Sequence, residues 1–318
     1  MLVKMEGFPL TSVLPSTTST ALSTLASGLT PQEHGIVGFW VYFKELGDVV
    51  STLRFGPASS PGGYEEMGIL PEIFFPVKTA YETLAKKGVK SFIFNRQEYI
   101  NSGISQMMYR GCESLPYRNL TELFAKAKKT LEKRGRKFIY LYWDMIDVTA
   151  HMQGEKSKEF SKQIALMEGE LERFLGKVKD CLFLLTADHG HLAIPLRRQK
   201  SFLDYPDLLA NLACPPTGES RVWYLFAKKG REKQVREYLK NNFSKRAFVF
   251  PSGDLLKRGF FGRGKPLKET RDRIGDFTLI AKKNWLFTYP YLEGRGAVSF
   301  HGGLSKEEML VPFLWRRF

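Results

Sequence analysis

Two short segments combine carboxylate and imidazole side chains, and they are the first places to look for chemistry. Asp147 is followed four residues later by His151, and the second segment reads Asp188-His189-Gly190-His191. Carboxylates and imidazoles are the usual protein ligands of zinc and similar divalent metals. A single Asp–His pair is most often structural. Two such pairs, each following an apolar segment of strand length, favour a metal site.

A third segment crowds hydroxyl side chains at the start of a predicted helix. Pro15-Ser-Thr-Thr18 precedes a helical stretch that runs to Gly28, and Leu-Thr-Pro-Gln-Glu-His34-Gly35 follows it. A helix N-terminus has free N–H groups and the positive end of the helix dipole, so it favours phosphate. The same field helps to make a hydroxyl there a nucleophile. Serine and threonine are also ordinary N-caps, so this segment alone is weak evidence.

The metal-ligand candidates follow two apolar segments that are typical of buried parallel strands. Residues 137–143 and 181–186 are near-continuous apolar runs, and 91–94 is a shorter third one. Helical patterns lie between them, so we predict an α/β fold in which ligands bind beyond the carboxyl ends of the strands. The predicted helices cover 77–87, 119–134 and 160–175.

The segment 194–273 differs from its surroundings. It contains Pro215-Pro216 and many basic residues, with a strand pattern at 222–226 and a helical pattern at 231–241. We interpret it as an inserted, cap-like subdomain. Residues 1–193 and 274–318 then form the core.

Composition limits the class of protein. A hydrophobic content of 43% with 25% charged residues is ordinary for a soluble globular chain, and no apolar run approaches the ~20 residues that cross a bilayer. Three widely spaced cysteines and the absence of a signal pattern favour a cytoplasmic location. The net charge of +15 fits either a heat-adapted surface or the attraction of polyanionic ligands, and charge alone does not separate these.

Taken together, the motifs resemble the nucleotide pyrophosphatase/phosphodiesterase branch of the alkaline phosphatase superfamily. The segment from Pro15 to Gly35 resembles the nucleophile segment, Asp147-x-x-x-His151 the second metal motif, and Thr186-Ala-Asp188-His189-Gly190 the third. The segment His301-Gly-Gly-Leu-Ser-x-Glu-Glu-Met-Leu-Val-Pro312 is similar to the closing motif. The order is the expected one from about residue 11 onward, and the match is weakest over 194–273.

The resemblance implies a doubly wound sheet with helices on both faces, a small inserted subdomain and a two-metal site. It makes Thr18 the nucleophile and assigns two divalent ions, with zinc the favoured metal. One ion would be held by Asp147, His151 and His301, and the other, beside Thr18, by Asp188 and His189. His34 and His191 are expected to have structural or supporting roles.

Two departures from the family pattern stand out. Family members begin with a strand that ends in an Asp for the metal beside the nucleophile. Here Glu6 is the only acidic residue before Thr18, and the segment is shorter than a strand plus nucleophile loop requires. We therefore expect that strand and its Asp to be absent, with a truncated start favoured, and a gap or a shortened sheet as the result. The second departure is Phe39, which stands where phosphodiesterase members place an Asn; we expect it to be a core residue rather than a base-stacking one.

The sequence thus predicts metal-dependent hydrolysis of phosphodiester or nucleotide pyrophosphate bonds through a phospho-threonine intermediate. One alternative is a phosphomonoesterase or phosphonate hydrolase on the same scaffold. Another, from a different class, is a catalytically depleted basic protein that binds polyanions with strong salt dependence. The expected partner is a small phosphorylated substrate such as a nucleotide, with no stable nucleic-acid complex and no membrane association. The sequence leaves the oligomeric state open.

Overall fold

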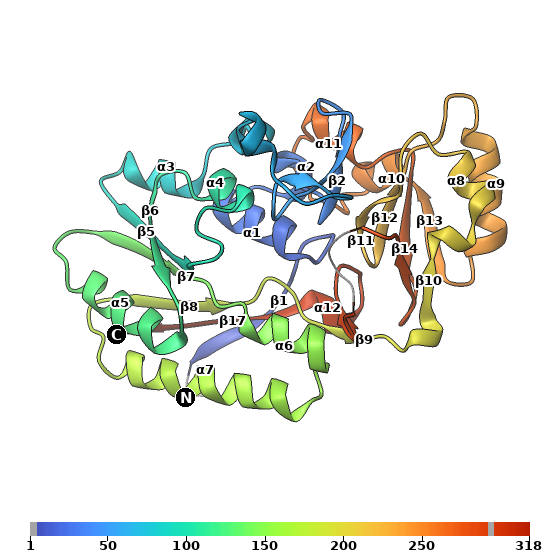
Figure 1. Ribbon diagram of the computed structural model, residues 1–318. Helices are drawn as coiled ribbons and strands as arrows, with labels where there is room; N and C mark the ends of the chain where they lie inside the picture. Colours follow the sequence, from blue (N-terminus) through green and yellow to red (C-terminus); the bar gives the residue numbers. More distant parts are fainter. Residues whose placement is uncertain (1–4, 292–295) are drawn as a thin grey trace.

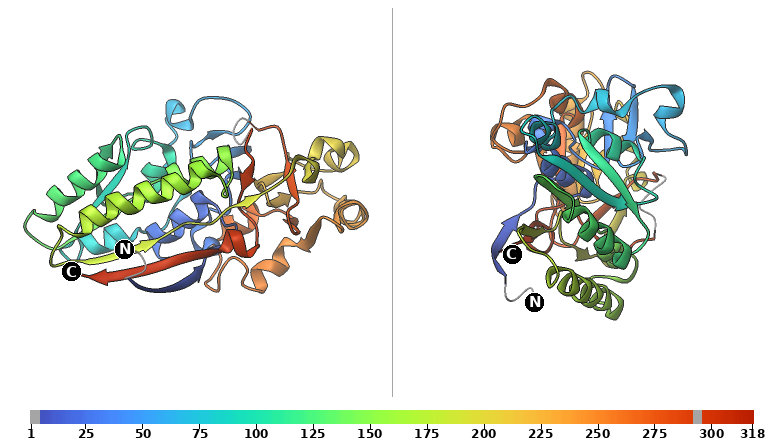
Figure 2. Two further views of the ribbon diagram at one scale, coloured as in Figure 1. Left: turned by 90° about the horizontal axis from the view of Figure 1, so that it is seen from below. Right: turned by 90° about the vertical axis from the view of Figure 1, so that its left-hand side faces the viewer.

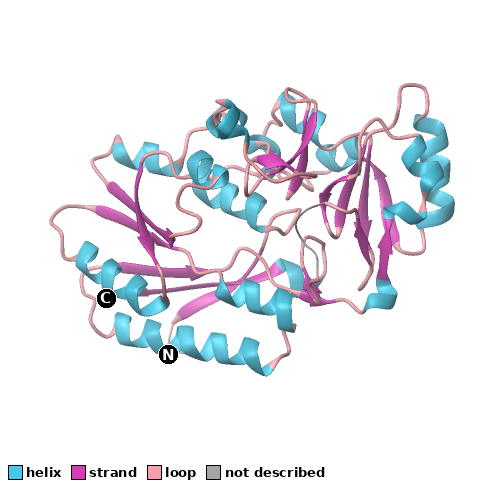
Figure 3. Cartoon of the chain, in the orientation of Figure 1, coloured by secondary structure: helices cyan, strands magenta, loops and turns pink. Residues whose placement is uncertain are grey.

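The computed structural model describes residues 5–291 and 296–318 (Figure 1). Met1–Lys4, part of the N-terminal segment discussed above, lies outside the described residues. Helices and strands alternate along much of the chain, and the sheets divide between the two ends of the molecule (Figure 3). The mixed α/β class predicted from the strand and helix patterns is confirmed.

Three parallel strands lie at one end of the molecule, and the last of them in the chain precedes the first candidate ligands. The sheet has the order β6-β5-β7, formed by β6 (Cys112–Tyr117), β5 (Lys90–Arg96) and β7 (Lys137–Leu141). Two amphipathic helices, α5 (Leu120–Leu131) and α7 (Lys158–Leu175), pack against its apolar side chains. Side-chain caps start both helices, because Asn119 accepts a hydrogen bond from the Glu122 amide and Ser157 from the Phe160 amide.

A second three-stranded sheet has the order β1-β17-β8, from β1 (Glu6–Thr11), β17 (Leu310–Arg317) and β8 (Leu182–Thr186). The prediction of a buried parallel strand at 181–186 is wrong in two respects. β8 pairs antiparallel with β17, and its alternate residues Leu182 and Leu184 are exposed. The partner strand lies more than a hundred residues away in the chain, so the local pattern carries no information about its direction.

The segment before Thr18 folds differently from the expectation. Residues 6–11 form β1, which pairs antiparallel with β17 and places the beginning and the end of the described chain side by side (Figure 2). The segment is therefore long enough for a strand and a loop, although it contains no aspartate. Among the described residues β7 pairs only with β5, and β8 only with β17, so the two strands that precede the candidate ligands lie in separate sheets.

The other end of the molecule is built on a seven-stranded sheet. Its interior strand β12 (Val222–Leu225) is buried on both faces: Val222 and Tyr224 join one apolar core, and Trp223 and Leu225 the other. Strands from the predicted insertion share this sheet with strands from the predicted core, so the expected boundary at residue 194 does not coincide with a sheet boundary. In order, the sheet contains β13 (Ala247–Pro251), β14 (Phe277–Ala281), β12, β11 (Thr217–Glu219), β2 (Trp40–Phe43), β3 (Asp48–Ser51) and β4 (Gly56–Pro57).

Among the described residues, no helix is both long enough and apolar enough to cross a bilayer.

Further helices and strands connect these sheets. The remaining helices are α1 (Thr18–Ser27), α2 (Pro31–His34), α3 (Ala80–Ala85), α4 (Gly103–Met108), α6 (Met145–Gln153), α8 (Pro206–Ala210), α9 (Glu232–Phe243), α10 (Ser252–Lys257), α11 (Lys268–Arg273) and α12 (Lys306–Met309), and the remaining strands are β9 (Leu192–Ala193), β10 (Gln199–Ser201), β15 (Leu286–Thr288) and β16 (Ser299–Phe300).

Candidate active site

Four parts of the chain carry the candidate residues: α1, α6, the loop after β8 and the position after β16. The helices α1 and α6 and the strand β9, which pairs with β16, lie near the middle of the molecule (Figure 1). Asp147 and His151 lie one turn apart on α6, which follows β7. Asp188 and His189 stand in the loop after β8. His301 follows β16, and β16 pairs with β9, so His301 is held beside this loop.

Asp147 is the centre of the cluster. Its Oδ1 lies 2.7 Å from His191 Nε2, 3.6 Å from His151 Nε2 and 4.0 Å from His189 Nε2. The rings of His189 and His301 stack with centroids 3.7 Å apart. Four of the five histidines of the chain therefore gather around one carboxylate.

Three of these histidines are oriented in the same way. Nδ1 of His151 contacts the Ser299 carbonyl oxygen at 2.8 Å, Nδ1 of His189 the Gly190 carbonyl oxygen at 3.0 Å, and Nδ1 of His301 the Ser16 carbonyl oxygen at 3.0 Å. A carbonyl oxygen only accepts, so Nδ1 carries the proton. The Nε2 lone pair is then left free to bind a metal, the usual arrangement around metal-ligating histidines.

His191 is held differently, and the sequence-based expectation gave it only a supporting role. Its Nε2 contacts Asp147, while its buried Nδ1 has no hydrogen-bond partner. It enters the cluster because the strand pairing of β9 with β16 starts immediately after it. The signal available in the sequence was its position two residues after His189.

The charges of the cluster depend on one another. Burial favours a raised pKa for Asp147, but the hydrogen bond from His191 and the neighbouring His189 outweigh it and hold the pKa well below its usual range. Burial alone would lower the pKa of His189, yet Asp188 and Asp147 raise it. Burial and the neighbouring His189 and His151 lower the pKa of His301, which leaves that imidazole neutral as a ligand must be.

The donor atoms form two triads that could each hold a metal ion. One consists of Asp147, His151 and His191 and the other of Asp147, His189 and His301, and within each triad the ligating atoms lie within 4.8 Å of one another. One shared carboxylate with inward-facing Nε2 atoms fits a divalent ion such as zinc. This division differs from the expected one, because Asp188 belongs to neither triad and instead lies 3.4 Å from His189 Nε2.

Thr18 is the first residue of α1 and faces the cluster. Its Oγ1 lies 3.1 Å from His189 Nε2. The hydroxyl groups of its two neighbours are used elsewhere: Ser16 donates to the Gly303 carbonyl at 2.9 Å, and Thr17 donates to buried Glu219 at 2.6 Å. Of these three hydroxyl residues, Thr18 is therefore the one positioned for chemistry.

Two buried carboxylates that the sequence analysis did not single out support this arrangement. Glu219 holds Thr17 and lies against Gly302, where a Cβ would approach the Glu219 side chain to 2.2 Å at a φ of +110°. Glu308 forms a two-point ion pair with buried Arg221, at 2.6 and 2.9 Å, and accepts from the Gly303 amide at 2.8 Å. The Ser305-x-x-Glu308 capping box was the visible signal for Glu308.

Residues 4–304 match the family model for type I phosphodiesterase/nucleotide pyrophosphatase. The chain belongs to this family. No curated protein sequence matches it significantly. An inactive variant of murine ectonucleotide pyrophosphatase/phosphodiesterase 5 in complex with AMP is structurally similar, with 18% identity, a TM-score of 0.76, and coverage of 99% of this chain and 81% of the other. Phosphonoacetate hydrolase from Sinorhizobium meliloti 1021, in complex with phosphonoformate, shows 17% identity, a TM-score of 0.72 and coverage of 99% and 82%.

Membership of the type I phosphodiesterase family makes the chain a hydrolase of phosphate esters or anhydrides. Phe39, where the family pattern suggests Asn, is partly buried and packs edge-on against Trp40, with ring centroids 4.9 Å apart. The position therefore contributes to the core, as expected, and offers a phosphate no hydrogen-bond donor from its side chain.

The fifth histidine of this phosphodiesterase-family chain, His34, is fully buried outside the cluster. Its Nε2 lies 2.9 Å from Thr24 Oγ1, and its Nδ1 accepts from the Ile36 amide. Burial and the nearby Arg273 lower its pKa from 6.5 to about 3. The imidazole of His34 therefore binds a proton more readily in the unfolded chain than in the folded one. Its contribution to the free energy of unfolding is complete above the pKa of the unfolded chain, and it is lost as the pH falls from that value toward the pKa of the folded protein.

We therefore expect the unfolding free energy to drop by about 2 kcal/mol between pH 7 and pH 5 through His34 alone. Urea unfolding of the wild type and of His34→Gln at both pH values measures this change. The variant should lose that part of the pH dependence, whatever its stability at pH 7. An equal pH dependence in the two proteins would contradict the assignment.

Proposed function

We propose that the chain is a metal-dependent phosphodiesterase or nucleotide pyrophosphatase that works through a phospho-threonine intermediate on Thr18. The observation that carries this proposal is the 3.1 Å contact between the Thr18 hydroxyl, at the N-terminus of α1, and His189 in the histidine–carboxylate cluster. The residues that would hold two divalent ions are Asp147, His151, Asp188, His189 and His301, with His191 as a further candidate. Bound ions, zinc being the favoured metal, would neutralise charge on the phosphoryl oxygens.

The residues of the chain have defined tasks in this proposal. Thr18 Oγ attacks phosphorus, the ester oxygen leaves as an alcohol with the proton given up by the threonine, and water then hydrolyses the phospho-threonine to restore the hydroxyl. The Thr17 side chain does not cap α1, since it donates to Glu219, so the first N–H groups of the helix stay available for phosphate oxygens.

A comparison of three substrates tests the proposed reaction. With zinc present, we expect bis(p-nitrophenyl) phosphate to be hydrolysed at least about tenfold faster, in kcat/KM, than p-nitrophenyl phosphate, a difference of about 1.4 kcal/mol. Phosphonoacetate is the third substrate. A preference for the monoester or for phosphonoacetate would favour the alternative reactions, phosphomonoester or phosphonate hydrolysis, on this scaffold. Two observations support these alternatives: the Phe39 side chain packs against Trp40, and the fold is similar to that of phosphonoacetate hydrolase.

Absence of turnover on all three substrates, together with salt-sensitive polyanion binding, would contradict the proposed reaction and would favour the alternative of a catalytically depleted protein that binds polyanions. The natural substrate is proposed to be a small phosphorylated compound such as a nucleotide. A cytoplasmic location, expected from the three cysteines, stays a prediction.

A further inference from the structure

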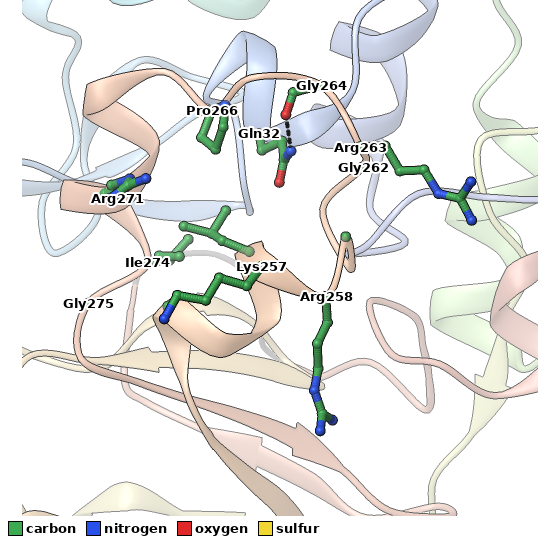
Figure 4. A pocket seen from close by; sticks show the side chains of 13 residues that line it. Gln32, Lys257, Arg258, Gly262, Arg263, Gly264, Pro266, Arg271, Ile274 and Gly275 are labelled. Atoms are coloured by element: carbon green, nitrogen blue, oxygen red, sulfur yellow. Dashed lines mark hydrogen bonds between the residues drawn. The ribbon is translucent and has the colours of Figure 1, made fainter.

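A cavity of about 650 Å³ lies between α10, α11 and the glycine-rich loop that joins them (Figure 4). α2 closes one side of it through Gln32. None of the seven residues proposed for catalysis or metal binding lines this cavity. Its described lining contains no aspartate or glutamate, whereas four basic side chains belong to it: Lys257, Arg258, Arg263 and Arg271.

The four basic side chains stand around the opening. All four are exposed, and within the described part of the chain none of them forms an ion pair. Figure 4 shows them on different sides of the cavity, on α10, the loop and α11, with the ends of Arg258 and Arg263 directed outward. Acidic residues do occur on the same helices, Asp254 on α10 and Glu269 and Asp272 on α11, but they lie outside the lining. The opening is therefore suited to an anionic group.

The floor of the cavity has a different character. Leu256 and Pro266 give it apolar surface above the buried Ile274, and Gln32, only 3% exposed, contributes its side-chain amide. Gln32 Nε2 donates to the Gly264 carbonyl, while Oε1 is buried without a hydrogen-bond partner and points toward the middle of the cavity (Figure 4). A buried acceptor without a donor is costly, so a ligand that brings a donor to this atom is favoured.

The glycine-rich loop fixes the shape of this floor. A Cβ on Gly262 would approach the Thr30 side chain to 2.2 Å, and one on Gly264 would approach Glu33 to 1.9 Å. The Phe261 carbonyl of this loop also accepts a hydrogen bond from the backbone N–H of Gln32, at 3.0 Å. The Glu33 carboxylate is engaged by Thr30, at 2.9 Å from its amide and 2.7 Å from its hydroxyl. The wall is thus preformed, which lowers the cost of binding.

We propose that this cavity is a second ligand site, separate from the histidine–carboxylate cluster, and that it binds a nucleoside phosphate. The phosphate would lie at the opening, which Lys257, Arg258, Arg263 and Arg271 make electropositive. The base or ribose would cover the apolar floor and donate a hydrogen bond to Gln32 Oε1. Inorganic phosphate could bind at the basic opening but would make no contact with the floor. This difference distinguishes the proposed ligand from a simple anion.

Equilibrium dialysis with AMP and with inorganic phosphate tests the site. The pocket variant is Lys257→Gln/Arg258→Gln, and the matched control is Arg231→Gln/Lys233→Gln, which removes the same charges from exposed positions around the start of α9. We expect the wild type and the control to bind AMP at one more site per chain than the pocket variant does. At that additional site, the affinity for AMP should be at least tenfold above the affinity for inorganic phosphate. Diester hydrolysis, where present, should be equal in all three proteins.

Two results would overturn the proposal. Unchanged AMP stoichiometry and affinity in the pocket variant would show that the cavity binds no nucleotide, and equal affinity for AMP and phosphate would reduce it to a simple anion site. Gln32→Met gives a second, charge-neutral check, and it should weaken AMP binding while leaving phosphate binding unchanged. Because binding is measured directly, failure of the proposed hydrolase activity does not affect the outcome.

Discussion

Replacing Thr18 with alanine is expected to lower kcat for phosphodiester hydrolysis by about 10³- to 10⁶-fold, the range found when a covalent nucleophile is removed. The hydroxyl makes one contact in the cluster, at 3.1 Å from His189 Nε2, and the partly buried Thr18 side chain belongs to neither apolar core beside α1. Folding and metal content should therefore change little. Rates on bis(p-nitrophenyl) phosphate, circular dichroism and metal per chain measure the three quantities.

Thr18→Ser is the matched control, because it keeps the hydroxyl and should retain much of the rate. Acid quenching during turnover followed by peptide mass spectrometry should find the phosphoryl group on Thr18. An undiminished rate in Thr18→Ala would remove the nucleophile role from this residue. Ser16 and Thr17 would be poor substitutes, since both hydroxyls are buried and donate to Gly303 and Glu219.

Local patterns in the sequence predicted those helices and strands whose own residues show helical or strand periodicity. The helix predicted at 160–175 appears as α7, which buries Leu171, Phe174 and Leu175, and the strand predicted at 222–226 appears as β12. Continuous apolar runs also located β7 and β8. Helix caps, apolar periodicity and runs of strand length are short-range properties, and residues within a few positions of each other determine them.

Features that depend on distant partners were not predictable in the same way. The direction of β8 depends on β17, and the seven-stranded sheet joins Trp40 to Gly218 across the boundary expected at residue 194. The candidate site shows the same division. Motifs supplied the candidate ligands, but the support from Glu219 depends on a contact with Thr17, 202 residues away in the chain.

Asp147 should dominate metal binding, and Asp147→Asn is expected to lower the affinity for zinc by at least about 100-fold. Both triads share its carboxylate, and four imidazoles surround it, so no other single replacement removes a ligand from both. Asp144→Asn is the matched control on the same turn. Asp144 pairs with Arg96 at 3.3 Å and belongs to neither triad, so its replacement should leave bound metal unchanged. Zinc per chain after dialysis against buffered zinc gives the affinity without reference to activity.

The same measurement separates the two ways of dividing the ligands. If the triads hold the ions, His191→Asn should weaken one site and His301→Asn the other, while Asp188→Asn should change zinc content little. If instead Asp188 and His189 hold the ion beside Thr18, Asp188→Asn should remove about one zinc per chain and His191→Asn should remove none. The orientation of the rings favours a role for His151, His189 and His301 in either case, because their Nδ1 atoms are fixed by carbonyl oxygens and their Nε2 atoms face inward. Zinc content in Asp147→Asn equal to that of the wild type would contradict both divisions, since the metal would then have to be held away from this cluster.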